Sequence, residues 1–177
     1  MRNLSTRSWA PALTLIAAFA ATPAWAQTFT MNKECRAAVA AANGLNDAKQ
    51  YAESLSAFDA IVDQCDTKDG KEAVQVGRAR ALNGLGRHEE AITAADAALE
   101  VTKDTSLFAY FERAYAQEQM GMADSATADY NRIIELTEKN QNVAERATIY
   151  AKVADLNYKA GKPAEAEQYL AKAMELD

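Results

Sequence analysis

Three glycines mark a repeat that constrains the fold of this 177-residue chain more than any other feature of its sequence. Gly86, Gly121 and Gly161 lie 35 and 40 residues apart, with an alanine seven residues before and five residues after each. An earlier, more degenerate copy has Lys49 in place of the glycine, and its other matching positions are held by Ala42, Ser54, Phe58 and Ile61. The repeat predicts a row of similar structural units.

Each unit has the pattern of two helices that meet at the glycine. Apolar residues recur at three- and four-residue steps on both sides of it, for example over residues 108–120 and 123–136. Glycine accepts the left-handed conformation that ends many helices, and Pro163 stands where a second helix begins. The sequence after residue 26 shows no sustained two-residue alternation of the kind typical of strands. We therefore predict an all-α fold of antiparallel helix pairs.

This pattern resembles the tetratricopeptide repeat family. Three stretches carry the resemblance: residues 86–92 with 98–100, a set around Gly121 (Tyr110, Arg113, Ala114, Ala126, Asp129, Tyr130 and Ile133), and a set around Gly161 (Tyr150, Ala154, Ala166 and residues 173–176). The resemblance implies a right-handed α-solenoid of about four antiparallel helix pairs. We place its units at residues 35–68, 72–105, 107–140 and 147–177.

The chain departs from the family pattern at two kinds of position. The proline that the family has near the end of each unit is absent, and Asp66, Lys103 and Glu138 stand there. Gln117 and Asn157 replace a usual aromatic residue in the first helix of their units. A helical-repeat family with longer units is therefore the alternative.

The first 26 residues have the pattern of a secretory signal peptide. Arg2 and Arg7 precede a short apolar run over residues 11–21, and Ala24-Trp25-Ala26 forms a small-x-small cleavage signal. The run is shorter than the about 20 apolar residues of a spanning helix, which disfavours an uncleaved membrane anchor. A lipid anchor at Cys35 is also disfavoured, because the three preceding residues are not small and apolar.

Cleavage before Gln27 leaves a leader over residues 27–34, which we expect to be flexible, and a repeat domain over residues 35–177. We expect the mature protein in the periplasm of a Gram-negative cell or outside the cell, with no membrane insertion. Its net charge changes from −6 to −8, because the signal segment holds two arginines and no acidic residue. An acidic surface repels phosphate backbones and anionic lipids, so nucleic acid is not an expected partner.

Cys35 and Cys65 stand at the start and near the end of the first expected unit. In an antiparallel helix pair these two ends lie at the same level, so the sulfurs can meet, and export leads to an oxidising compartment. We predict a disulfide between them, with two free, buried thiols as the alternative. We expect no metal site, because His88 is the only histidine in the chain.

Residues for catalysis are also lacking. His88 follows a turn and would have to serve alone in any Ser–His–Asp arrangement. Glu89 and Glu90 stand at the start of an expected helix, where their charge favours the helix dipole. Gly77, Gly84 and Gly86 do not follow a strand, as the glycines of a phosphate-binding loop would. We expect neither an enzyme activity nor a cofactor.

The resemblance implies that the first helices of the units line a concave groove that binds a peptide or protein segment. Read onto this chain, the candidate groove residues are Asn43, Val76, Arg80, Asn83, Phe108, Phe111, Tyr115 and Tyr158. Exposed aromatic residues usually mark an interaction site, so we predict a binding or scaffolding module. A role in cell-envelope assembly is what export and the resemblance together imply. The alternative is that Phe108 and Phe111 pack between neighbouring units. The groove suits an apolar segment with a basic or polar flank.

The last expected helix provides a second candidate surface. Solenoids usually need a polar cap at their end, but Leu170, Ala173 and Met174 give this helix an apolar face. Self-association through that face, which would make the protein a structural homo-oligomer, is the alternative function. The helix can equally stay exposed, because alanines dominate it.

Overall fold

The structure is a computed structural model that describes residues 31–138 and 143–176. The expected signal peptide over residues 1–26, its cleavage site and residues 27–30 of the expected leader lie outside the described residues. The described part contains no strand. Its eight helices are α1 (Lys33–Asp47), α2 (Tyr51–Ile61), α3 (Lys68–Gly84), α4 (His88–Thr102), α5 (Leu107–Gln119), α6 (Ala123–Glu138), α7 (Val143–Lys159) and α8 (Pro163–Leu176).

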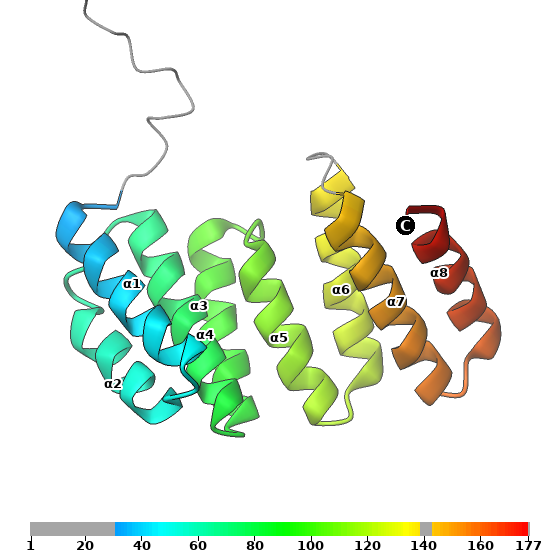
Figure 1. The fold of residues 1–177 in the computed structure, drawn as a ribbon, viewed down its shortest axis with the longest axis horizontal. Helices are drawn as coiled ribbons and strands as arrows, with labels where there is room; N and C mark the ends of the chain where they lie inside the picture. Colours follow the sequence, from blue (N-terminus) through cyan, green and yellow to red (C-terminus); the bar gives the residue numbers. More distant parts are fainter. Residues whose placement is uncertain (1–30, 139–142, 177) are drawn as a thin grey trace, which may run out of the picture.

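The helices form four antiparallel pairs that follow one another in chain order (Figure 1). This arrangement confirms the expected all-α solenoid. Each pair packs within itself and against the next, since α2 contacts α3, α4 contacts α5 and α6 contacts α7. Helix α1 begins at Lys33, so the last two residues of the expected leader belong to the first helix.

Polar side chains at the helix starts satisfy backbone N–H groups that have no partner within the helix. Asn32 Oδ1 accepts a hydrogen bond from the Cys35 N–H (2.7 Å). Thr67 and Ser106 hydroxyls accept equivalent bonds at the starts of α3 and α5. These caps fix where the first helices of three units begin.

The three repeat glycines end the first helices of their units, as the sequence predicts. Gly86, Gly121 and Gly161 have φ angles of +72°, +74° and +73°. The residue after each glycine returns a hydrogen bond to the preceding helix; for example, the Arg87 N–H donates to the Leu82 carbonyl (2.9 Å).

Small side chains bring the two helices of each pair together. The alanines on either side of each turn are buried at positions 79, 91, 114, 126, 154 and 166. In the first pair the corresponding residue is Ser54, whose buried hydroxyl donates to the Ala42 carbonyl (2.9 Å). In α3, Gly77 leaves room for the fully buried ring of Phe58 from α2.

The first pair is closed by the predicted disulfide between Cys35 and Cys65, whose Cα atoms lie 5.3 Å apart. Both cysteines are buried. They pack in one apolar cluster with Val39, Phe58 and Val74, which joins α1, α2 and α3. The bond therefore ties the start of α1 to the segment that leads into the second pair.

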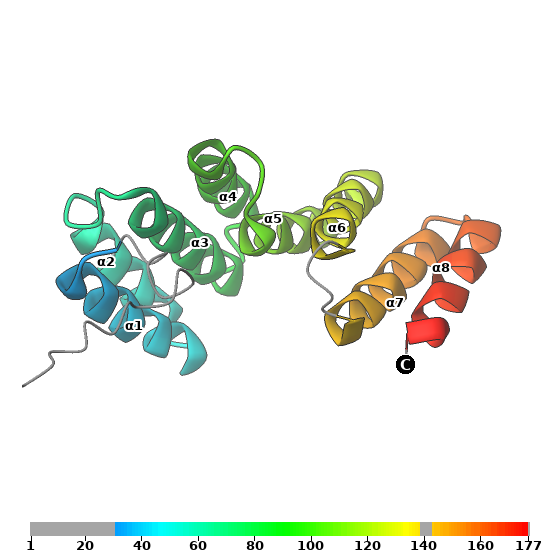
Figure 2. The same ribbon diagram turned by 90° about the horizontal axis from the view of Figure 1, so that it is seen from above.

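The first helices α1, α3, α5 and α7 lie along the inner side of an arc, which opens downward in Figure 2. Two asparagines tie the first three of them together. Asn46 of α1 donates through Nδ2 to the Gly77 carbonyl of α3 (3.1 Å), and Asn83 of α3 donates to the Glu112 carbonyl of α5 (2.9 Å). Both asparagines are the twelfth residue of their unit, and both carbonyls belong to the sixth residue of the next.

The interface between the third and the fourth unit is built differently. The twelfth residue of the third unit is Glu118, and a carboxylate cannot donate a hydrogen bond to a carbonyl. Glu118 instead pairs with the Lys152 ammonium at the sixth position of the next unit (2.8 Å). In the described residues α3 packs closely against both α1 and α5, whereas the backbones of α5 and α7 lie farther apart and are bridged by the pair of Glu118 and Lys152. The inner side of the arc is therefore open between the third and the fourth pair.

Candidate functional site

Two adjoining hollows lie on the inner side of the arc. The first has a volume of about 680 Å³ and is lined from α1, α3 and α5, among others by Asn43, Asp69, Glu72, Val76, Arg80, Phe108 and Glu112. The second has a volume of about 440 Å³ and is lined mainly from α5, α6 and α7 by Leu107, Phe111, Ile133, Thr137, Thr148 and Ile149. Arg80, Phe108 and Glu112 line both, so we treat the two hollows as one concave groove.

The groove carries two large apolar side chains that are open to solvent. Phe108 is 71% exposed and Phe111 is 47% exposed. Phe111 is held from one side by an edge-on contact with the buried Tyr130 ring, whose centroid lies 6.1 Å away. The backbones of α5 and α7 are not closely packed, and the next unit leaves both rings open to solvent. The two phenylalanines therefore form part of the groove wall and are not buried between units.

Tyr115 and Asn83 lie one helical turn further along α5 and α3. Tyr115 is 37% exposed and makes an edge contact with the His88 ring (centroids 6.3 Å apart). Asn83 is only 6% exposed, and its Oδ1 lies 3.2 Å from Nδ1 of His88. Asn83, predicted as a groove residue, is therefore buried beside the groove, and its Nδ2 donates to the carbonyl and carboxylate of Glu112.

The groove is acidic over its first hollow. Four carboxylates, of Asp47, Asp69, Glu72 and Glu112, lie in or beside it, and the only cation among its lining residues is Arg80. The Arg80 guanidinium is already paired with Asp47 (3.0 Å). Burial raises the pKa of the Glu112 carboxyl, and the hydrogen bond from Asn83 and the charge of Arg80 only partly oppose this rise.

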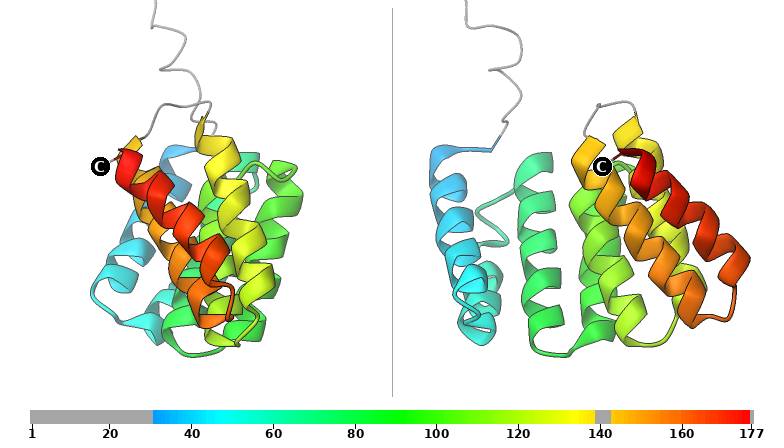
Figure 3. Two further views of the ribbon diagram at one scale, coloured as in Figure 1. Left: turned by 90° about the vertical axis from the view of Figure 1, so that its right-hand side faces the viewer. Right: turned by 45° about the vertical axis from the view of Figure 1, so that its right-hand side comes forward.

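Tyr158, an expected groove residue, lies in a separate hollow of about 420 Å³ between α7 and α8. Helix α8, which lines this hollow, lies at one end of the row of described helices (Figure 3). We call its exposed surface the end face; its lining residues are Ala151, Ala154, Asp155, Tyr158, Pro163, Ala166, Glu167 and Leu170. The structure thus brings Tyr158 together with Leu170 and away from Phe108.

The other two expected residues of the last helix differ in exposure. Met174 is exposed beside the end face, whereas Ala173 is buried and packs in the apolar cluster of the third and fourth pairs. Ala173 is thus removed from the surface that we expected for self-association. The apolar surface that remains in α8 is formed by Leu170 and Met174.

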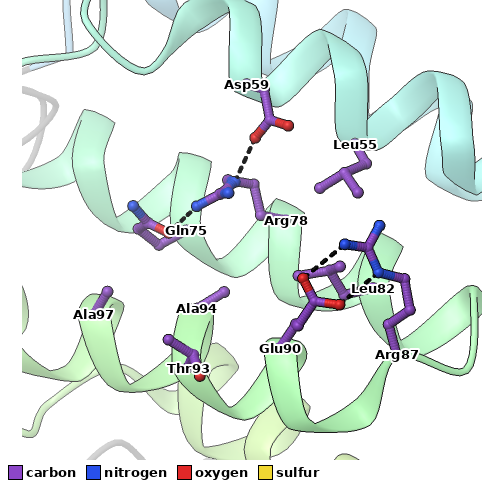
Figure 4. A pocket seen from close by; sticks show the side chains of 10 residues that line it. All are labelled: Leu55, Asp59, Gln75, Arg78, Leu82, Arg87, Glu90, Thr93, Ala94 and Ala97. Atoms are coloured by element: carbon purple, nitrogen blue, oxygen red, sulfur yellow. Dashed lines mark hydrogen bonds and ion pairs between the residues drawn. The ribbon is translucent and has the colours of Figure 1, made fainter.

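A further hollow of about 340 Å³ lies on the outer side between α2, α3 and α4 (Figure 4). It contains two guanidinium groups, which would suit an anion if they were free. Arg78 donates to Asp59 (2.7 Å), and Arg87 is bidentate to Glu90 (2.7 and 2.6 Å). Both charges are neutralised within the chain, so the concave groove is the stronger candidate site.

The sequence alone identified Arg80, Phe108 and Phe111 of the second hollow, but not the residues of its floor. This floor contains the buried Ile133 and Ile149, and Glu112, which the sequence-based set also lacks, lines both hollows. The one available signal was the longer spacing of 40 residues between Gly121 and Gly161, against 35 for the preceding pair of glycines. That spacing indicates a longer connection but not that two helices separate.

Comparison with protein families identifies two repeats in this chain. Residues 109–140 and 147–177 match the tetratricopeptide repeat model, close to the expected third and fourth units. The comparison with curated proteins found no match. The resemblance inferred from the sequence is thereby confirmed for these two stretches.

Solved structures with the same arrangement support the fold over most of the chain. A putative kinesin light chain with nearly identical TPR-like repeats from Podosopora anserina has a TM-score of 0.69 at 18% identity, covering 81% of this chain and 74% of that one. A crystal structure of MamA has a TM-score of 0.66 at 16% identity, covering 80% and 77%. MamA from Desulfovibrio magneticus RS-1 has a TM-score of 0.65 at 12% identity, covering 80% and 75%. At these identities the likeness concerns the fold alone.

Proposed function

We propose that this chain, whose residues 109–140 and 147–177 are tetratricopeptide repeats, is a protein-interaction module that binds a segment of another protein in its concave groove. A repeat scaffold of this kind is consistent with protein binding in general. The observation that carries the proposal for this groove is the exposure of Phe108 and Phe111 beside a hollow with an apolar floor. Apolar side chains in such a hollow are typical anchors for a partner.

We further propose that the module acts after export, as a scaffold in cell-envelope assembly. Two observations support this location: the signal-like pattern of residues 1–26 and the disulfide between Cys35 and Cys65. None of the helices in the described ranges is long and apolar enough to cross a membrane. Cell fractionation with N-terminal sequencing tests the location, and a cytosolic protein that begins at Met1 would contradict it.

The groove is tested by replacing its two exposed rings. In the Phe108→Ala/Phe111→Ala variant we expect partner capture from an envelope extract to fall by at least about tenfold, because each ring contributes hot-spot contact area. The matched control is Met122→Ala, which removes an exposed apolar side chain at the turn between α5 and α6. The two variants are compared at equal concentration after circular dichroism has shown that both are folded.

Partners that remain bound equally well to the double alanine variant would contradict the groove. A specific set of partners lost from Phe108→Ala/Phe111→Ala and retained by Met122→Ala is the expected result.

The end face supports a second candidate function, homo-oligomerisation. Phe58, Ala95 and Tyr130 occupy the twenty-fourth position of the first three units, each of which has a further unit packed against it, and all three are fully buried. Leu170 occupies the same position of the fourth unit and is 49% exposed. The end face therefore has the composition of a unit-to-unit interface, and a second copy of the chain is one partner that could cover it.

A further inference from the structure

The two halves of the concave groove differ in chemistry. The hollow between α5 and α7 is apolar, with Phe111 in its wall and Ile133 and Ile149 at its floor. The hollow between α1, α3 and α5 is lined by Asp69, Glu72 and Glu112 beside Val76. Because Phe108 and Glu112 belong to both hollows, a bound segment that fills one places its neighbouring residues in the other.

Among the described residues, Glu72 and Glu112 in the acidic half form no salt bridge with a cation of the groove, and the charge of Arg80 acts on Glu112 only in part. Arg80 is its only lining cation, and Asp47 already takes that charge at 3.0 Å. The Glu112 carboxylate accepts a hydrogen bond from the neutral amide of Asn83 and forms no salt bridge among the described residues. A carboxylate in a partly apolar hollow gains more from an opposite charge than an exposed carboxylate does.

We propose that the groove selects a partner segment in which a large apolar side chain is followed or preceded, within a few residues, by lysine or arginine. The apolar side chain enters the hollow between α5 and α7. The basic side chain lies over Glu72 and Glu112 in the neighbouring hollow. This inference rests on the proposed function and adds the chemistry of the partner to it.

The raised pKa of Glu112 agrees with this assignment. Burial disfavours the ionised carboxylate of Glu112 in the free protein, and groups of the chain offset this effect only in part. A cation brought by the partner would stabilise the ionised form. Anionic segments would add a like charge to Glu72 and Glu112 and would be rejected. A neutral apolar segment would gain only the contacts of the second hollow.

The test uses a phage-displayed library of random twelve-residue peptides, selected on the purified protein and counter-selected on Phe108→Ala/Phe111→Ala. We expect the enriched peptides to pair an aromatic or branched aliphatic residue with nearby lysine or arginine. The best peptide is then synthesised, labelled and measured by fluorescence anisotropy. Replacing its basic residues by glutamine should weaken binding about three- to tenfold, more at low salt than at high salt.

Variants of the protein test the acidic residues themselves. Glu72→Gln/Glu112→Gln should lose most of the preference for the basic peptide over its glutamine counterpart; glutamine at 112 can still accept the bond from Asn83. The control Glu53→Gln/Glu89→Gln removes the same charge from exposed positions outside the groove and should keep the preference. Should the first double variant fail to fold, Glu72→Gln alone must reduce the preference in the same direction.

The possible outcomes separate the inference from the proposed function. Enriched peptides that depend on Phe111 but carry neutral or acidic flanks would overturn the inference and leave the groove standing. The inference would also be overturned if the Glu72→Gln/Glu112→Gln variant kept the parent protein's preference for the basic peptide over its glutamine counterpart. If the selection yields no peptide that binds the parent protein more tightly than Phe108→Ala/Phe111→Ala, both the inference and the proposed groove binding are overturned.

Discussion

Lys49 holds a backbone conformation that the other three units give to glycine. Its φ angle is 59°, and the Gln50 N–H donates to the Leu45 carbonyl (2.8 Å) in the same way as Arg87 donates to Leu82. The turn geometry is thus shared by all four units although the residue is not. A side chain in the left-handed region costs about 1–2 kcal/mol through contact of its Cβ with the backbone.

We predict that Lys49→Gly stabilises the protein. Lys49 is exposed, so its loss removes no packing, and relief of the left-handed strain should exceed the added entropy of the unfolded chain by about 0.5–1 kcal/mol. Thermal unfolding should show a midpoint roughly 1–4 °C higher. Gly86→Ala is the reciprocal control, since no atom of the fold would meet its Cβ, and its midpoint should fall. An unchanged or lower midpoint for Lys49→Gly would contradict the strain.

Individual residues differ in how far the sequence could place them. The turn glycines and the buried alanines follow from local pattern, because their roles depend only on their own helix pair. Asn83 does not, since its direction depends on how closely α5 approaches α3 and on the carbonyl that Glu112 presents. The same dependence on a neighbouring unit explains why Glu112 was missed as a groove residue.

Among the helix pairs, the first depends most on a covalent link. Its cluster around Cys35, Cys65 and Phe58 is small, and α2 has no side-chain cap at its start. The disulfide closes a loop with a sequence separation of 30 residues. Loop-closure entropy makes such a bond worth about 3–4 kcal/mol against the unfolded chain.

We therefore predict that Cys35→Ala/Cys65→Ala loosens the first pair before the rest of the solenoid. Units of a solenoid contact only their neighbours, so a local loss need not unfold the distant units. Hydrogen exchange followed by mass spectrometry should show faster exchange in α1 and α2, with α7 and α8 little changed. Reductant should reproduce the effect in the parent protein and add nothing in the double variant. Uniform acceleration along the chain would contradict an independent first unit.

The order of helices was predictable, but the spacing between them was not. Each helix follows from its own apolar periodicity and its turn, and the units expected at 107–140 and 147–177 correspond to α5–α6 and α7–α8. The opening between α5 and α7 depends instead on two units at once. It coincides with the change from an asparagine-to-carbonyl bond to the pair of Glu118 and Lys152.

Across the whole molecule, the solenoid presents two surfaces of different chemistry. The concave groove combines exposed rings with an excess of carboxylates, which suits a partner of complementary charge. The end face is mainly apolar and small, with Asp155 and Glu167 as its only charged lining residues. The two surfaces share no lining residue, since Tyr158 and Leu170 belong to one and Phe111 to the other.

The last prediction concerns the assembly of whole molecules. If copies associate through the end face, Leu170→Glu should abolish the association, because it places a charge where the apolar contact must form. Sedimentation velocity over a range of concentrations should then show a dimer for the parent protein and a monomer for the variant. Phe111→Ala, which alters the groove only, should leave the dimer intact. A parent protein that sediments as a monomer at every concentration would remove the end face as a self-association surface and leave groove binding as the remaining function.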